Sequence, residues 1–488
     1  MADTQPEDLQ KVHERRRKRE SLLETLESIL VAFVLAFVFR AFVVEAFVIP
    51  TGSMAPTLVG AHTEFECEDC RYRFSVGAEG RGPPPVCPNC FLQQTIPPRG
   101  APLFSGDRVL VLKFLYDFEE PKRWDVIVFR NPNEPAQNYI KRLVALPDET
   151  MELRDGDVTI DGRRVTKTDR AQDALWMVVH DTRYRALRST WSPRWRADAA
   201  WHAEGAGWRL GAPPGREVFL TYEHRDPAGR PSNILDFYAY NTSGNGTRLG
   251  SNVCTDLALR TKVTLEDAAA VCAVELAPYR DRFRFELTAR GAGRPTRVLM
   301  NGRTVAETPD GVLAVGRSAE VLAANVDRKL MLRVNGKRVL TAFAGPVSAE
   351  GDPTYEPAPL SEDERRRMDG LAGGAGGVRV GASGGPVALE YLRLDRDVYY
   401  TNEWMRTTGE PGHATQGHPF ALGEGEFFVL GDNSPNSSDC RLWDLDRPVV
   451  PHRNLVGKAF FVYWPAAGRR TDLGIPLVPD PTGWRFVH

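Results

Sequence analysis

The sequence predicts a mainly β protein that is divided into several units. Short runs of alternating apolar and polar residues recur along most of its 488 residues. Turn-forming pairs such as Asp161-Gly162 and Asn335-Gly336 separate many of them. One long apolar run and two C-x2-C pairs come before these strands. Because the chain is longer than a typical domain, we expect about two to four units.

The charge of the chain argues against a nucleic-acid partner. The 62 basic and 64 acidic residues leave a net charge of -2, so no overall positive field attracts phosphates. The basic residues 15–19 stand directly before the apolar run. A basic block in that position is typical of the cytoplasmic side of a membrane segment, which we favour over a nucleic-acid arm.

The apolar run covers residues 29–49 and is interrupted only by Arg40 and Glu45. A helix of about 20 residues is about 30 Å long, enough to cross a bilayer. A cleaved signal peptide and a buried helix are the alternatives, but no small-residue cleavage site ends the run. We therefore predict one transmembrane helix at residues 27–49, with the N-terminus cytoplasmic and the rest of the chain outside.

The run leads into a segment, Ile49 to Thr57, in which Ser53 stands between Gly52 and Met54. Prolines near both ends keep this segment extended. An extended segment just outside a membrane suits a nucleophile that attacks another extended chain. The alternative is an ordinary loop, because the same residue types are common in turns.

Two pairs of cysteines follow, Cys67 with Cys70 and Cys87 with Cys90. The C-x2-C spacing of each pair is typical of a tetrahedral zinc site. Four thiolates leave no open coordination position, so we expect a structural Zn²⁺ rather than a catalytic one. Two disulfides are the alternative, which an oxidising compartment would favour.

The next region alternates in the manner of β-strands. Strands are predicted at residues 108–112, 124–129 and 139–146, and the third contains Lys141 among apolar residues. A hairpin is predicted at residues 157–165, with its turn at Asp161-Gly162.

A long region of further short strands follows, and its regular strand–turn spacing favours a β-sandwich. Phe283, Phe285 and Leu287 are predicted to face one side of a strand. The stretch of residues 321–340 resembles laminin-G-like or concanavalin-like modules. That resemblance implies a carbohydrate or protein ligand, or a spacer. Whether Cys254 and Cys272 form a disulfide in this region is left open.

Four segments resemble, in order, the sequence boxes of bacterial type I signal peptidases, which are membrane-anchored Ser/Lys proteases. The segments are Ile49 to Thr57, Ser105 to Val111, Tyr139 to Asp148 and Gly431 to Arg441. The last box departs from the family pattern at three positions, Ser434, Pro435 and Cys440.

The resemblance implies that Ser53 is the nucleophile and Lys141 its general base. A charged lysine, with an ordinary pKa of about 10.4, cannot accept a proton. Burial among apolar residues would favour the neutral amine. The resemblance further implies that Thr51 and the backbone N–H of Ser53 bind the oxyanion of the tetrahedral intermediate. No cofactor is expected for catalysis.

The resemblance assigns supporting roles to the last box. Ser437 would orient the lysine through a hydrogen bond, and Asp439 and Arg441 would form an ion pair that shapes the site. The opening residues Gly431, Asp432 and Asn433 would support the same loop.

The predicted organisation interrupts the catalytic domain twice. The expected ranges are 1–26 (basic N-terminus), 27–49 (membrane helix), 50–61 (catalytic, with the nucleophile), 62–99 (zinc-ribbon-like insertion), 100–173 (catalytic, with the base), 174–396 (β-sandwich insertion), 397–466 (catalytic) and 467–488 (tail). We expect the sandwich to be separable from the catalytic domain.

The expected function is the cleavage of signal peptides from exported preproteins at the outer face of the cytoplasmic membrane. Preproteins and the lipid bilayer are the expected partners. A related self-cleaving Ser/Lys peptidase is a second enzyme hypothesis. A binding hypothesis is a degenerate, membrane-tethered protein that acts through the sandwich.

Overall fold

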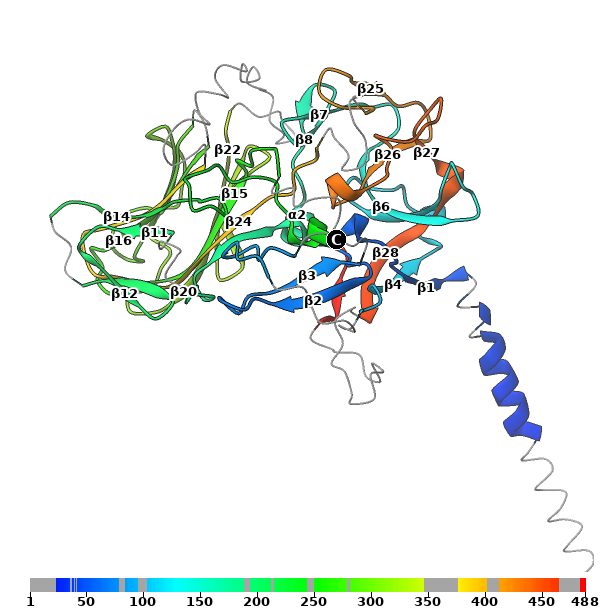
Figure 1. The fold of residues 1–488 in the computed structure, drawn as a ribbon, viewed down its shortest axis with the longest axis horizontal. Helices are drawn as coiled ribbons and strands as arrows, with labels where there is room; N and C mark the ends of the chain where they lie inside the picture. Colours follow the sequence, from blue (N-terminus) through cyan, green and yellow to red (C-terminus); the bar gives the residue numbers. More distant parts are fainter. Residues whose placement is uncertain are drawn as a thin grey trace, which may run out of the picture.

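The structure, a computed structural model, describes residues 23–35, 37–38, 40, 42–78, 84–94, 103–187, 194–211, 215–243, 250–278, 281–345, 376–401, 412–464 and 483–488. It is mainly β, as predicted (Figure 1). The short helices are α2 (Asp169–Leu175), η1 (Gly52–Met54), η2 (Leu115–Asp117), η3 (Ala239–Ser243), η4 (Ser434–Asn436) and η5 (His452–Asn454).

A central sheet gathers strands from both ends of the chain. In spatial order it contains β1 (Val44–Val48), β4 (Arg108–Leu112), β28 (Leu455–Trp464), β5 (Val126–Arg130), β6 (Asn138–Ala145), β26 (Glu426–Leu430) and β27 (Val450–Pro451), and β29 (Arg485–Phe486) pairs with β28. The predicted strands of the second and third boxes are confirmed as β4 and β6. Because β6 lies beside β26, residues far apart in the sequence meet within one sheet.

The transmembrane helix predicted for residues 27–49 is wrong at its C-terminal end. Residues 23–35 are helical, but Val44–Val48 forms β1 and pairs antiparallel with β4. Phe47 packs there against a buried apolar cluster, so β pairing and burial favour the strand in this part of the run. Within the described residues, no helix has both the length and the apolar character to cross a membrane. The basic residues 15–19 lie outside the described part.

A smaller four-stranded sheet contains β25 (Phe420–Ala421), β7 (Thr150–Arg154), β8 (Asp157–Ile160) and β9 (Arg163–Arg164). The predicted turn between β8 and β9 has positive φ angles at both central residues, 51° at Asp161 and 78° at Gly162. Such angles belong to the tight hairpin turn that favours an Asp-Gly pair. The hairpin prediction is therefore confirmed.

The inserted region is a β-sandwich of two antiparallel sheets. One contains β12 (Trp201–Glu204), β13 (Gly207–Leu210), β24 (Val387–Arg396), β15 (Leu257–Leu265), β20 (Ala319–Val326), β21 (Lys329–Val334), β22 (Lys337–Phe343) and β10 (Met177–Asp181). The other contains β11 (Trp195–Ala197), β14 (Val218–Tyr222), β23 (Gly376–Ser383), β16 (Val271–Pro278), β17 (Phe283–Thr288), β18 (Arg297–Met300) and β19 (Arg303–Glu307).

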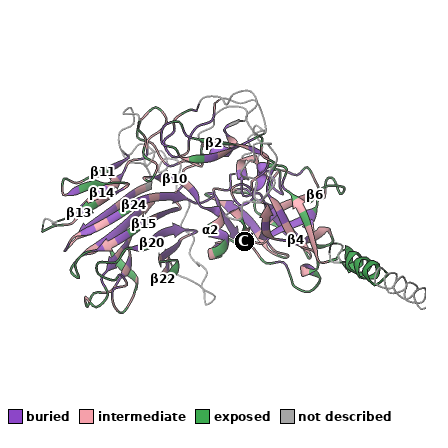
Figure 2. Ribbon diagram, turned by 90° about the horizontal axis from the view of Figure 1, so that it is seen from below, coloured by how far each residue is buried: buried purple, intermediate pink, exposed green. Residues whose placement is uncertain are grey.

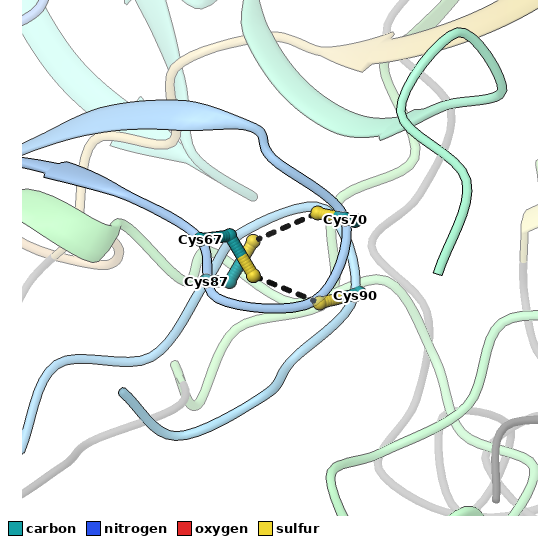
Figure 3. A group of neighbouring side chains, drawn as sticks. All are labelled: Cys67, Cys70, Cys87 and Cys90. Carbon is teal, nitrogen blue, oxygen red and sulfur yellow. Dashed lines mark hydrogen bonds between the residues drawn. The ribbon is translucent and has the colours of Figure 1, made fainter. Parts of the chain in front are cut away.

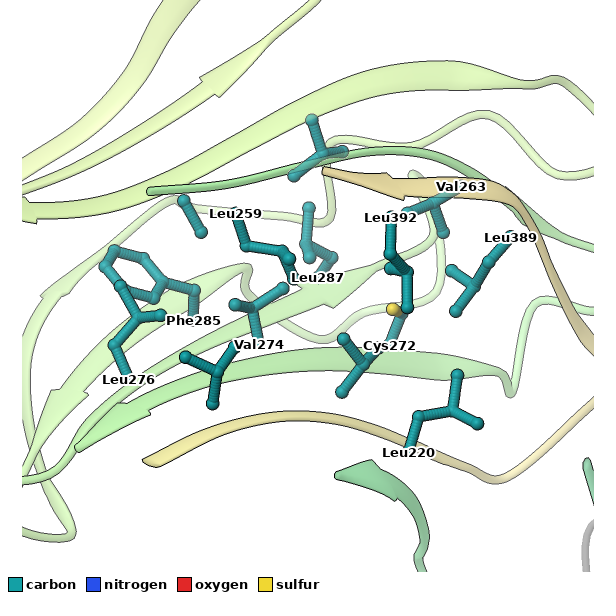
Figure 4. Packing of buried hydrophobic residues seen from close by; sticks show 14 of the residues in the cluster. Leu220, Leu259, Val263, Cys272, Val274, Leu276, Phe285, Leu287, Leu389 and Leu392 are labelled. Atoms are coloured by element: carbon teal, nitrogen blue, oxygen red, sulfur yellow. The ribbon is translucent and has the colours of Figure 1, made fainter. Parts of the chain in front are cut away.

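The core of the sandwich lies between these sheets. Figure 4 shows Leu259 and Leu392 of one sheet packed against Val274 and Leu287 of the other. The predicted alternation along β17 is confirmed, because Phe283, Phe285 and Leu287 are all buried. Cys254 and Cys272 are also buried, and both are free thiols.

A buried ion network joins the entry and exit of the sandwich. Lys167, which precedes α2, donates from Nζ to Asp327 Oδ1 at 2.6 Å and to Asp397 Oδ2 at 2.8 Å. Asp327 lies in the turn after β20, and Asp397 directly follows β24. Burial alone would lower the pKa of Lys167, but the two carboxylates raise it well above its ordinary value. The lysine therefore stays charged and holds the two crossing segments together.

Candidate active site

Ser53 and Lys141 meet where η1 contacts β6, an interior strand of the central sheet. Ser53 lies in η1, between an extended Thr51 and an extended Ala55. Lys141 lies on β6, and its Nζ donates to Ser53 Oγ at 2.9 Å and to the Ile140 carbonyl at 3.1 Å. The two residues are 88 positions apart in the sequence. The contact between β6 and η1 brings the amine to the serine hydroxyl.

The surroundings of Lys141 favour its neutral form. The side chain is buried, and burial lowers its pKa from 10.5 to about 8, although Asp439 and Asp432 oppose the shift. A neutral amine at this distance can accept the proton of the serine hydroxyl. The pair is therefore equipped to act as nucleophile and base near neutral pH.

Arg142, the residue after the lysine, is fully buried and holds Asp432 of the last box. Its Nε and Nη2 donate to the two carboxylate oxygens of Asp432, each at 2.7 Å. Its Nη1 and Nη2 also donate to the Trp124 carbonyl and to Thr57 Oγ1. One guanidinium therefore ties together β6, the last box and the segment that carries Ser53.

Asn433 fixes the backbone on both sides of the serine. Its Nδ2 donates to the Gly52 carbonyl at 2.9 Å, and its backbone N–H donates to the Ser53 carbonyl at 3.0 Å. Gly431 permits this approach, because a Cβ placed on it would lie 2.5 Å from the Ser53 carbonyl oxygen. The Gly-Asp-Asn opening of the last box thus packs directly on η1.

The other residues of the last box form a buried support. Arg441 makes a two-pronged ion pair with Asp439, at 2.8 Å from Nε and 2.8 Å from Nη2. Ser437 is buried nearby, but its hydroxyl has no hydrogen-bond partner among the described residues. The hydrogen bond predicted between Ser437 and the lysine is therefore not present, because the amine is directed at Ser53 Oγ and the Ile140 carbonyl.

The departures from the family pattern are accommodated locally. Ser434 Oγ accepts from Arg441 Nη1 at 2.7 Å and from the Thr401 backbone N–H at 2.9 Å. Cys440 is buried, and its sulfur accepts from the Val429 backbone N–H at 3.3 Å. Pro435 occupies the start of η4, where its ring is compatible with the backbone.

Thr51 borders the site on its exposed side. Its side chain is exposed and does not cap η1. The Thr51 hydroxyl and the Ser53 backbone N–H lie on the same short segment, and both are hydrogen-bond donors.

The four cysteines form one buried cluster at the end of the hairpin of β2 (His62–Glu66) and β3 (Arg73–Gly77) (Figure 3). Cys67 Sγ lies 3.5 Å from Cys90 Sγ, and Cys70 Sγ lies 3.6 Å from Cys87 Sγ. All four are free thiols. A disulfide needs about 2.05 Å, whereas ligands about 2.3 Å from a tetrahedral zinc lie about 3.8 Å apart. The spacing fits a structural metal site.

Each cysteine pair closes the same turn. The residue after the second cysteine, Arg71 or Phe91, has a positive φ, 63° or 60°. Its backbone N–H donates to the carbonyl of the first cysteine, Cys67 or Cys87, at 3.0 Å or 2.9 Å. Because both cysteine pairs form the same turn, their four sulfurs lie together in one cluster.

The site also contains residues that the sequence did not single out. No sequence pattern singled out Arg142, because it stands beside the predicted base in an otherwise apolar strand. Tyr240 and Asn241 come from η3 in the sandwich insertion, far from every box. No local pattern could have identified them, because only the fold brings η3 to Gly52 and Asn433.

Comparisons with known proteins match parts of this chain. A family model described as "Signal peptidase, peptidase S26" matches residues 100–190 and 367–464. Signal peptidase I P of Bacillus subtilis subsp. natto is 24% identical over 149 residues, which cover 30% of this chain and 56% of that protein. Signal peptidase I of Pseudomonas aeruginosa is 30% identical over 152 residues, covering 29% and 38%. The chain thus spans about half the length, or less, of these relatives.

A solved carbohydrate-binding module from Bacillus subtilis is similar only in outline. It aligns over 41% of this chain and 95% of its own, at 8% identity and a TM-score of 0.25. This likeness is too weak to indicate a ligand.

The two matched ranges include β4, β5 and β6 before most of the sandwich insertion and β26, β27 and β28 after it, and these six strands share the central sheet. This chain therefore contains a domain that matches the signal peptidase family model of peptidase S26, split in sequence by a β-sandwich and accompanied by a four-cysteine cluster.

Proposed function

We propose that this chain is a membrane-anchored serine endopeptidase that removes signal peptides from exported preproteins. The observation that carries the proposal is the 2.9 Å hydrogen bond between the buried Lys141 Nζ and Ser53 Oγ. The family match supports the choice of substrate class. The aligned residues cover only part of each relative. The reaction is therefore proposed from the site of this chain.

The proposed reaction uses these two side chains in sequence. Ser53 Oγ attacks the scissile carbonyl carbon as Lys141 Nζ takes its proton. The oxyanion accepts hydrogen bonds from the Ser53 N–H and from Thr51 Oγ1. Lys141 then gives the proton to the leaving amine, and an acyl-enzyme forms. The neutral lysine next activates a water molecule, which releases the cleaved segment and restores Ser53.

The proposed location is the cytoplasmic membrane, with a single pass and the catalytic site outside. The helical residues 23–35 expose apolar side chains, with Leu30 at 64% and Phe33 at 60% (Figure 2). A contiguous exposed apolar surface of this kind indicates a membrane or partner contact. An extended preprotein segment would bind by pairing with a strand edge near Ser53. A carbohydrate or protein ligand of the sandwich stays a prediction.

The test is cleavage of a preprotein by the purified full chain in detergent across a range of pH. The neutral lysine is the active form, so the rate should rise with pH and level off above the Lys141 pKa of about 8. Mass spectrometry should place the cut at the end of the signal peptide. A rate independent of pH between 6 and about 9 would contradict a lysine base.

The four-cysteine cluster gives a separate prediction about metal. We propose that Cys67, Cys70, Cys87 and Cys90 hold one structural Zn²⁺, since four thiolates fit its tetrahedral preference. Elemental analysis should find about one zinc per chain. Stripping with a chelator should expose the hairpin of β2 and β3 to proteolysis. Two disulfides detected by mass spectrometry in place of zinc would overturn the metal assignment.

A further inference from the structure

Helix η3 of the sandwich insertion contacts the backbone that carries Ser53. It lies between β14 and β15 in the sequence, yet it packs on β3 and on Gly52. We propose that η3, through Asn241, is a positioning element of the active site, so the inserted sandwich contributes to catalysis. This inference rests on the proposed function of Ser53 as the nucleophile.

The contact begins with Tyr240, which is 2% exposed. Its ring covers two glycines, since a Cβ on Gly52 would lie 2.0 Å from the ring and one on Gly77 would lie 2.6 Å from it. Its hydroxyl donates to the Ala61 carbonyl at 3.0 Å. Tyr240 thus packs η3 against the Ser53 segment and against the hairpin of β2 and β3.

Asn241 extends this contact to the last box. Its Nδ2 donates to Asn433 Oδ1 at 2.7 Å, and its Oδ1 accepts from Asn433 Nδ2 at 2.8 Å. Two reciprocal hydrogen bonds hold the two amides together. The same Nδ2 of Asn433 donates to the Gly52 carbonyl at 2.9 Å. Asn241 therefore restricts rotation of the amide that holds Gly52.

The Gly52 carbonyl matters because it belongs to the same planar peptide unit as the Ser53 N–H. Fixing the carbonyl fixes the direction in which that N–H points. The Ser53 N–H is a proposed oxyanion donor, and such donors act only when they are aimed correctly at the developing charge. The path therefore runs from Asn241 through Asn433 to the Gly52–Ser53 peptide, and it touches no substrate atom.

The expected effect falls on turnover rather than on substrate binding, because the oxyanion exists only in the transition state. Asn241→Ala should lower kcat about 10-fold with KM unchanged, less than the 10²–10³ expected for losing a donor outright. Asn433→Ala should lower kcat by about 10². Asn241→Ala added to Asn433→Ala should change kcat by less than about 2-fold, since Asn241 acts through Asn433.

The matched control lies in the same helix. Thr242→Ala removes a bond to the Ala239 carbonyl within η3 and none to the last box, so kcat should stay within about 2-fold of the wild type. If Asn241→Ala fails to fold, Asn241→Asp keeps the size and removes the donor to Asn433 Oδ1. It should lower kcat in the same way.

A second measurement does not depend on cleavage. Hydrogen exchange followed by mass spectrometry should show faster amide exchange in residues 49–58 of Asn241→Ala than in the wild type or Thr242→Ala. An unchanged kcat with unchanged exchange would overturn the inference, as would equal losses in Asn241→Ala and Thr242→Ala. Full cleavage by Ser53→Ala would instead overturn the proposed function, so the two failures are distinguishable.

Discussion

Lys141→Arg abolishes peptide cleavage, with kcat/KM expected to fall by about 10³ or more. The guanidinium stays protonated at every pH at which the protein is folded, so it cannot accept the serine proton. The guanidinium group is also larger than the ammonium group, and it would enter a pocket in which Nζ already contacts Ser53 Oγ and the Ile140 carbonyl. The measurement is steady-state cleavage of a preprotein in detergent at pH 9, above the Lys141 pKa of about 8.

The controls distinguish loss of the general base from other effects of replacing a lysine by an arginine. Lys113→Arg makes the same exchange at a residue whose Nζ pairs with Glu45 at 3.2 Å on a part-exposed surface, and it should leave the rate unchanged. Ser53→Ala should be as inactive as Lys141→Arg, because the pair acts as a unit. Thr51→Ala should lower kcat by only about 10²–10³-fold, the usual effect of losing one oxyanion donor. Near-normal turnover by Lys141→Arg would rule out the Ser/Lys mechanism.

Asp432→Asn destabilises the fold by about 3–5 kcal/mol, the usual cost of breaking a buried ion pair. Asp432 and Arg142 are both fully buried, at 0% side-chain exposure. The amide keeps the shape of the carboxylate but leaves the guanidinium charge without a counter-charge. The measurement is chemical denaturation of the double variant Ser53→Ala/Asp432→Asn against Ser53→Ala, so that proteolytic activity does not affect the comparison.

A surface ion pair provides the comparison. Glu426→Gln breaks the pair with Arg447, whose side chain is 52% exposed, and it should cost less than about 1 kcal/mol. If Asp432→Asn proves as mild as Glu426→Gln, Arg142 is held by its carbonyl and hydroxyl acceptors rather than by Asp432.

The proposed positioning of the serine backbone by η3 bears on whether the sandwich is separable. The sequence predicted a separable sandwich, because complete boxes flank it. A deletion of residues 174–394 would also remove Tyr240 and Asn241, which contact Gly52 and Asn433. We therefore expect such a deletion to fold and yet turn over slowly.

Local sequence patterns predicted much of the fold and of the candidate site of this protein. Turn pairs such as Asp161-Gly162 specify hairpins because few residues tolerate their backbone angles. The paired C-x2-C spacing predicted four clustered sulfurs, because each pair closes one tight turn. The boxes predicted that Ser53 and Lys141 meet, and the structure places them 2.9 Å apart.

Tertiary structure alone decided the rest. The end of the apolar run became β1 rather than helix, because β4 offered an edge to pair with and a core to fill. Ser437 was left without the lysine as a partner, because the Lys141 amine is directed elsewhere. Arg142 and Asn241 gained their roles from partners about 200 to 300 residues away, at Asp432 and Asn433. No sequence pattern linked these distant partners, so their contacts become visible only when the chain is folded.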